Sequence, residues 1–152
     1  MMKIFNNKHE LSIRALFILY SFNKELTIEG IAALDLITTY GKEFELLNYN
    51  LHGNNPLSFC EISTRRIEMK ESMKFLVIKG MVNVISSKNG FLYIINEKGK
   101  NICEQIESEY GKEYLKLSKI LANKLDFNTL INEISSKLLS INFKIEITSF
   151  IS

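Results

Sequence analysis

The stretch LVIKGMVNVISSKNGFLYIINEKG, residues 76–99, decides the fold. It holds two apolar, β-branched runs, at 81–86 and 91–96, separated by a Ser-Lys-Asn-Gly turn. Asn-Gly between two such runs is the strongest short-range signal for a β-hairpin. Gly80 can end a helix before the hairpin, and Asn96 can cap a helix after it. We therefore predict a helix–hairpin–helix junction in the middle of the chain.

Towards the N-terminus, the hydrophobic period is that of helices. The first of them is apolar nearly all round, which is typical of a helix buried at the centre of a domain or against a partner. Thr27 is a good N-cap for the second helix, and Gly41 can stop it. The loop at 48–58 holds the only proline. The predicted helices are residues 9–22, 28–40, a short one at 42–47, and a long one from Cys60 to Gly80.

Towards the C-terminus, a helix is expected from Glu97 into an apolar stripe formed by Ile102, Ile106 and Tyr110. Further helices are predicted at 111–124 and 128–140, and residues 143–151 alternate as a strand or an interface tail would. The fold class is therefore mainly α with a small β-hairpin. The order of elements predicts a winged helix-turn-helix-like domain at residues 1–110. A helical extension at residues 111–152 would pack on the core or on a partner.

Composition is that of one folded domain. The chain has 152 residues with 46% hydrophobic and 24% charged residues, which excludes wholesale disorder. Its two cysteines are too few for a disulfide framework. No signal peptide is recognisable, and the longest apolar run, 15–20, is far shorter than the ~20 residues of a membrane span. We expect a cytoplasmic protein that does not enter the membrane.

Positive charge is concentrated in the middle of the chain. The net charge is +2, but residues 60–100 hold eight Lys and Arg against four Glu, a local +4. Arg66, Lys70 and Lys74 are four residues apart and would form one ridge along the long helix, with Arg65 beside it. Such a ridge can follow a phosphate backbone or meet an acidic partner. It can equally be a solvated face braced by a Glu61–Arg65 pair.

Other candidate binding residues lie on the hairpin. Lys88 and Asn89 could contact phosphate or a minor groove, or could simply form the turn. Asp35 stands in an otherwise apolar helical stretch, where a carboxylate needs a cationic partner if it is buried. Arg65 or Arg66 would be that partner.

Signals for catalysis are nearly absent. His9 and His52 lack metal-ligand spacing to each other or to a cysteine. Cys60 and Cys103 are interpreted as buried small hydrophobic residues, and no glycine-rich phosphate loop precedes a Lys-Ser or Lys-Thr pair. We expect a protein that is not an enzyme and that uses no cofactor and no metal.

The loop and the long helix resemble a known family, the middle components of bacterial ABC-three-component systems. In these systems an SMC/Rad50-like ATPase is encoded beside a small accessory protein and an effector, and the small third subunit of Lamassu-type anti-phage defence is similar. Ser58 and Ser72 depart from the family pattern, which often has Arg and Gly there. The residues that carry the resemblance are Leu51-His52, Pro56, Glu61, Arg65-Arg66 and Gly80-Met81-Val82.

The resemblance implies a non-catalytic accessory subunit of a defence complex. It would dock on the ATPase, form a hetero-oligomer that includes a nuclease-type effector, and meet double-stranded DNA through the complex. The family-motif loop with His52 and Pro56 would either hold the fold or contact the ATPase. The alternative is a free-standing winged-helix transcriptional regulator, a homodimer that binds a specific duplex alone with steep salt dependence.

Overall fold

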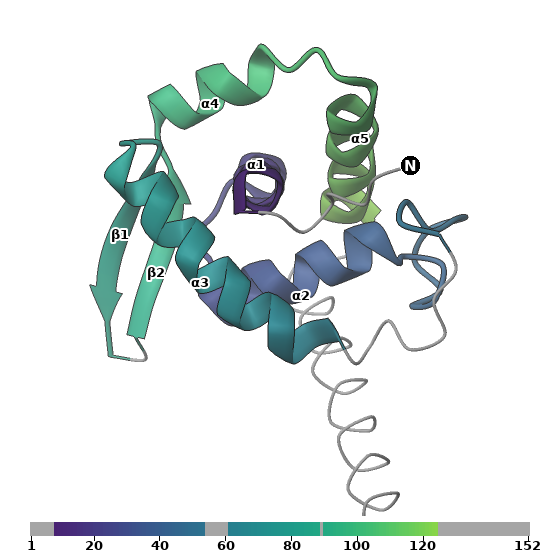
Figure 1. Ribbon diagram of the computed structural model, residues 1–152, viewed down its shortest axis with the longest axis horizontal. Helices are drawn as coiled ribbons and strands as arrows, with labels where there is room; N and C mark the ends of the chain where they lie inside the picture. Colours follow the sequence, from purple (N-terminus) through teal and green to yellow (C-terminus); the bar gives the residue numbers. More distant parts are fainter. Residues whose placement is uncertain (1–7, 54–60, 89, 125–152) are drawn as a thin grey trace, which may run out of the picture.

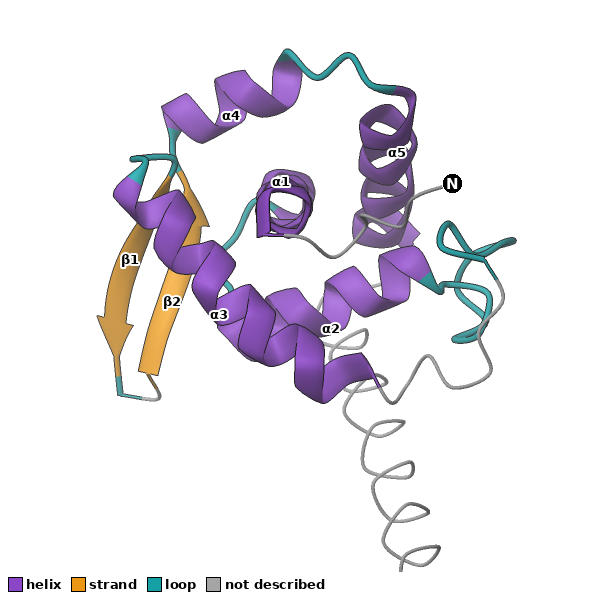
Figure 2. Ribbon diagram, viewed as in Figure 1, coloured by secondary structure: helices purple, strands orange, loops and turns teal. Residues whose placement is uncertain are grey.

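The computed structural model describes residues 8–53, 61–88 and 90–124. Within these residues the chain is mainly helical with one two-stranded antiparallel sheet, as the sequence predicts (Figures 1 and 2). The predicted helix at 128–140 and the tail at 143–151 lie outside the described residues. The elements are α1 (Lys8–Phe22), α2 (Ile28–Thr39), α3 (Ile62–Ile78), β1 (Val82–Ser87), β2 (Gly90–Ile95), α4 (Glu97–Glu104) and α5 (Glu109–Lys124).

Helix α1 is the centre of the molecule. Figure 1 shows it nearly end-on, with α2, α3, α4 and α5 arranged around it. Leu11 and every residue of 15–19 are at most 1% exposed. A helix that is apolar all round needs neighbours on every side, and the surrounding helices provide them.

Helix α2 begins and ends where the sequence predicts. The Thr27 hydroxyl accepts a hydrogen bond from the Gly30 amide at 3.0 Å, as an N-cap does. The helix ends at Thr39, just before Gly41.

The short helix predicted at 42–47 was wrong, because the structure has turns there. The Gly41 carbonyl accepts hydrogen bonds from the amides of Phe44, Leu46 and Leu47, and Glu45 has a left-handed φ of 60°. These bonds close the segment on itself, so the regular i to i+4 ladder of a helix cannot form.

Helix α3 ends in a Schellman motif that sets the direction of the hairpin. The Gly80 amide donates to the Val77 carbonyl, and the Met81 amide donates to the Leu76 carbonyl, each at 3.0 Å. Gly80 has a φ of +76°, a conformation that glycine adopts without steric cost. The sequence signal at Gly80 is therefore a true helix stop.

The hairpin has the predicted strands, with Val82 opposite Ile95 and Ser87 opposite Gly90. On its other edge, β2 is bridged by Leu26, which exchanges two backbone hydrogen bonds with Tyr93 at 2.8 and 3.0 Å. The segment between α1 and α2 is thus tied to the sheet, so the start of α2 lies beside β2.

The helix predicted from Glu97 to Tyr110 is divided into two. Asn96 caps α4 by accepting from the Gly99 amide at 3.1 Å, but α4 ends at Glu104. The Ser108 hydroxyl then accepts a hydrogen bond from the Gly111 amide at 3.0 Å, as the N-cap of a new helix would. This second cap starts α5, whose end at Lys124 matches the prediction.

Helix α5 packs on α1 through its buried residues, which include Tyr114, Leu117 and Leu121. The hydroxyls of Ser21 and Ser118 meet at 2.7 Å across this contact. In the part of the chain that the structure describes, no helix combines the length and the apolar character needed to cross a membrane.

Candidate partner-binding site

The predicted basic ridge lies on the outer face of α3. Arg66, Lys70 and Lys74 are all exposed. The opposite face of the helix is buried in the core through Met69, Met73 and Leu76, among other residues. Lys74 pairs with Glu71 at 3.4 Å, so the ridge is only partly neutralised by its own helix.

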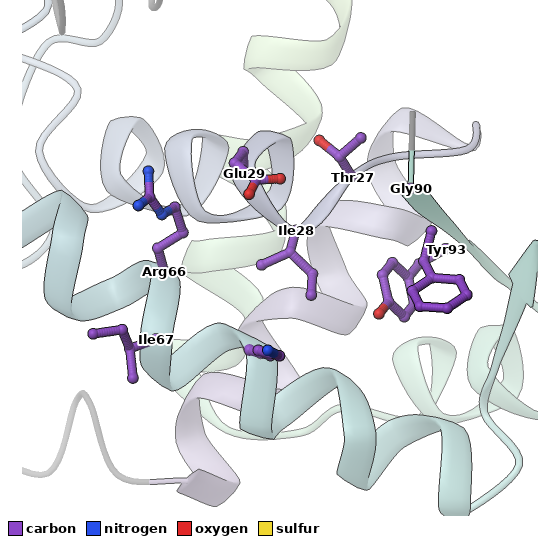
Figure 3. Close-up of a pocket in the computed structure, with 9 residues that line it drawn as sticks. Thr27, Ile28, Glu29, Arg66, Ile67, Gly90 and Tyr93 are labelled. Carbon is purple, nitrogen blue, oxygen red and sulfur yellow. The ribbon is translucent and has the colours of Figure 1, made fainter. Parts of the chain in front are cut away.

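Two residues of this ridge line a groove of about 340 Å³ between the start of α2, α3 and β2 (Figure 3). Arg66 and Lys70 supply its two cations, and Glu29 of α2 supplies one carboxylate. Ile67 and Phe91 also line it, although their side chains are 71% and 60% exposed. The remaining lining residues are Thr27, Ile28, Gly90 and Tyr93.

This groove combines charge with apolar surface. Large apolar side chains exposed singly are ordinary, but here Ile67 and Phe91 share one hollow with two cations. A segment with apolar residues beside carboxylates is the chemical complement of such a surface. We call these nine residues the α3 groove.

Arg65 is not part of this surface, because its side chain points into the core and the residue is 1% exposed. Its guanidinium donates to Asp35 Oδ2 at 3.1 Å and to Thr39 Oγ1 at 2.7 Å. It also pairs with Glu61 at 3.0 Å, one helical turn earlier. Arg65 is therefore the predicted partner of Asp35, whereas Arg66 faces solvent.

Asp35 is the centre of a buried ion network. Arg14 of α1 holds it with two hydrogen bonds, from Nε to Oδ1 at 2.9 Å and from Nη2 to Oδ2 at 2.5 Å. The Tyr114 hydroxyl of α5 donates to Oδ1 at 2.6 Å. Asp35, Arg14 and Tyr114 are each at most 1% exposed. The network joins α1, α2, α3 and α5.

The network shifts the pKa values of its own side chains. Burial alone would raise the pKa of Asp35, but the charges of Arg14 and Arg65 outweigh it and hold that pKa well below its usual range. Burial and the Asp35 charge raise the pKa of Tyr114 well above its usual value. Asp35 is therefore ionised and Tyr114 neutral at physiological pH.

His52 connects the loop after α2 to the rest of the fold. Its backbone amide donates to the Thr39 carbonyl at 3.1 Å, which satisfies a carbonyl at the end of α2. Its ring meets the Tyr110 hydroxyl at 2.5 Å through Nε2 and lies edge-on to Tyr40. Pro56, the other residue predicted in this loop, lies outside the described residues.

Of the two predicted hairpin residues, the structure describes only Lys88, which does not line the α3 groove. Lys88 is exposed at the tip of the hairpin, and Asn89 lies outside the described residues. The structure therefore brings Arg66 and Lys70 together in one hollow, with Lys74 one turn further along α3.

The structure describes the surroundings of one of the two cysteines. Cys103 has no exposed surface, and its burial raises the pKa of the thiol to about 12, so it is a buried small hydrophobic residue. Cys60 lies outside the described residues. Among the residues that the structure describes, no three His, Cys, Asp or Glu side chains are grouped so that they could hold a metal ion.

A comparison with protein-family models places the chain in a known family. The family model described as "ABC-three component (ABC-3C) system Middle Component 2" matches residues 4–141. No curated protein matches the chain. No solved structure matches it either.

Proposed function

Since the chain belongs to the family of ABC-three component system middle components 2, we propose that it is a non-catalytic accessory subunit that docks on an SMC/Rad50-like ATPase. In this proposal it links the ATPase, DNA sensing and a nuclease-type effector in an anti-phage or anti-plasmid complex of the Lamassu type. It acts in the cytoplasm as part of a hetero-oligomer.

The α3 groove is the observation that carries the docking proposal. Burying Ile67 and Phe91 on a partner would remove two large apolar side chains from water, at roughly 25 cal/mol for each Å² buried. Arg66 and Lys70, at the edge of the same hollow, would orient a partner segment that carries carboxylates. Apolar burial supplies affinity and the cations supply specificity.

A winged-helix arrangement is part of the proposal. The order α1, α2, α3, β1, β2, α4 supports it, as does the Leu26–Tyr93 bridge that joins the start of α2 to the hairpin. The connection from α2 to α3 runs from Tyr40 to Glu61, whereas DNA-binding helix-turn-helix proteins use a turn of ~3–4 residues. This long connection favours an accessory subunit over a DNA-reading module.

A transcriptional regulator is the second candidate. Three exposed cations at four-residue spacing on α3 and the exposed Lys88 at the hairpin tip favour it, because this pattern can follow a phosphate backbone. Ser63 and Thr64, exposed at the start of α3, could reach base edges. Such a regulator would bind a specific duplex without the other components.

The test is a pull-down of the tagged full chain co-expressed with the other two components of its own system. We expect the ATPase and the effector to be recovered with it. Ile67→Asp should reduce recovery of the ATPase at least tenfold, because it places a charge in the apolar part of the groove. Recovery would be measured by quantitative gel or mass spectrometry.

The matched control is Ile78→Asp. Ile78 is on the same helix and is 81% exposed, but it does not line the groove. It should leave recovery at the wild-type level. Equal losses from both variants would remove the groove as the docking site. A lone protein that binds duplex DNA with a steep salt dependence would replace the subunit proposal with the regulator.

A further inference from the structure

The outward face of α5 carries a second surface that the docking proposal does not use. One hollow of about 760 Å³ runs along the helix past Leu115 and Ile120. A smaller hollow of about 150 Å³ continues it towards Tyr49 in the loop after α2. The two share Lys116, Ile120 and Lys124, so they form one continuous surface, which we call the α5 surface.

Lysines surround the apolar part of this surface. Its lining includes Lys112, Lys116, Lys119 and Lys124, and among the residues that the structure describes no carboxylate lines either hollow. Lys124 donates to the Leu46 carbonyl at 2.7 Å, and Lys119 lies over the Tyr20 ring at 5.4 Å. Lys112 and Lys116 form no ion pair with any residue that the structure describes.

The described carboxylates near this surface lie outside its two hollows. Glu113 is half-buried on α5 but lines neither hollow. Glu104 at the end of α4 accepts a hydrogen bond from the Tyr20 hydroxyl at 3.2 Å. The α3 groove, by contrast, includes Glu29 among its lining residues. Among the described residues, the α3 groove therefore has one carboxylate in its lining, and the α5 surface has none.

We propose that the α5 surface is a second docking site, which binds an acidic amphipathic helix from another component of the same system. This inference rests on the proposed function. Residues 112–124 extend over about 18 Å at the 1.5 Å rise of an α-helix, so a partner helix of about three turns can lie along them. Its apolar side chains would contact Leu115 and Ile120, and its carboxylates would meet the lysines.

The apolar residues decide between a helix and a nucleic acid. Phosphates would pair with the lysines, but Ile120, which is 39% exposed, and Tyr49, which is 41% exposed, would gain little from a DNA backbone. An acidic amphipathic helix satisfies both the lysines and the apolar side chains.

The position of the surface allows two partners to bind at once. In Figure 1, the hairpin and the α3 side of the molecule lie at the left, and α5 and the loop after α2 lie at the right. A partner on the α3 groove therefore leaves the α5 surface open. The chain can thus act as a bridge between two other components.

The test compares two double variants with the same change of charge at the same helical spacing. Lys112→Glu/Lys116→Glu alters the α5 surface, and Arg66→Glu/Lys70→Glu alters the α3 groove. Each full-length variant is tagged and co-expressed with the ATPase and the effector of its system, and thermal unfolding verifies the fold. We expect Lys112→Glu/Lys116→Glu to reduce recovery of one component about tenfold or more while the other is retained. Arg66→Glu/Lys70→Glu should retain the component that the first variant loses.

Several results would overturn the inference. Recovery of both components by Lys112→Glu/Lys116→Glu at the wild-type level would remove the second site and leave the proposed function intact. Loss of the same component by both variants would mean that there is no separate site. Unchanged protein recovery with weaker binding of a labelled 30-base-pair duplex would make this a nucleic-acid surface. If the wild type recovers neither component, the proposed function itself fails.

Discussion

Asp35 shows how a single charge can be kept inside an apolar core. A carboxylate removed from water loses its hydration, and the loss is repaid only when close countercharges and hydrogen bonds replace it. Arg14 binds both carboxylate oxygens, Arg65 adds a third contact and Tyr114 a fourth. Three side chains from three helices thus make four hydrogen bonds to one carboxylate of a fourth helix.

Replacing Asp35 with Asn should destabilise the fold strongly. Arg14 and Arg65, each 1% exposed, would lose their shared countercharge inside the core. Removal of one partner from a buried ion pair costs about 3–5 kcal/mol. Urea unfolding of Asp35→Asn against the wild type measures this loss.

The control for that measurement is Arg66→Gln. Arg66 is next to Arg65 in sequence but faces solvent, so its free energy of unfolding should stay within about 0.5 kcal/mol of the wild type. A loss below about 1 kcal/mol in Asp35→Asn would show that the network contributes little to stability.

Part of this network could be predicted from the sequence. A lone carboxylate in an apolar helix needs a cation, and the prediction of Arg65 or Arg66 was confirmed for Arg65. Arg14 carries a similar signal, a cation within the apolar first helix, but the sequence does not indicate that it pairs with Asp35. Tyr114 is 79 residues away from Asp35, and no local pattern indicates their contact.

At the level of elements, Gly30 and Gly99 look equivalent in the sequence but differ in the fold. Each is the third residue of its helix and donates its amide to the N-cap side chain, at 3.0 and 3.1 Å. A Cβ on Gly30 would lie 3.3 Å from the nearest atom, the Thr27 hydroxyl. A Cβ on Gly99 would lie 2.5 Å from the Met81 carbonyl oxygen and 2.7 Å from Ile95.

Alanine at these two positions should therefore have different effects. Gly99→Ala forces α4 away from the start of the hairpin and should cost about 1–3 kcal/mol, the usual cost of overpacking. Gly30→Ala gains helix propensity and should stay within about 1 kcal/mol of the wild type. Paired urea titrations measure both, and similar losses would show that the close contact at Gly99 relaxes without cost.

Elements were predicted well where the signal was local. The hairpin, the caps at Thr27 and Asn96 and the stop at Gly80 depend on a few adjacent residues, and all of them were confirmed. The helix expected at 42–47 was wrong because the Gly41 carbonyl accepts hydrogen bonds from three amides of this segment. The spacing of apolar residues does not reveal such bonds. The division between α4 and α5 was not predicted, because the apolar stripe continues across it. The N-cap at Ser108, which starts α5, lies within that stripe.

For the whole molecule, the charges of the candidate site could be predicted from the sequence, but its shape could not. Arg66 and Lys70 were predicted from their spacing, and they do share a hollow. The apolar contribution of Phe91 was missed, because it depends on the Leu26 bridge that brings β2 beside α2. That bridge is a single pair of residues and has no pattern that a sequence could show.

Because the Asp35 network joins α1, α2, α3 and α5, its protonation should weaken the whole fold at once. The pKa of Asp35 is lowered in the folded state, so its stabilisation is complete above the unfolded pKa of about 3.9 and is lost as the pH falls below it. Burial raises the pKa of the half-buried Glu10, so the uptake of a proton there favours folding and offsets part of this loss.

Tyr114→Phe tests this acid dependence in a protein that should still fold. The variant removes one hydrogen bond that lowers the pKa of Asp35, so that pKa should rise towards its ordinary value. The free energy of unfolding near neutral pH should fall by about 1–3 kcal/mol, because the loss of the hydroxyl leaves part of a buried charge unsatisfied.

Urea unfolding at a series of pH values from 7 to 2.5 measures the acid dependence. It should show a single transition whose midpoint urea concentration falls on acidification, and this fall should be shallower in the variant. Parallel curves for the two proteins would mean that other carboxylates control acid unfolding, because the variant would then have changed stability without changing the proton uptake of Asp35.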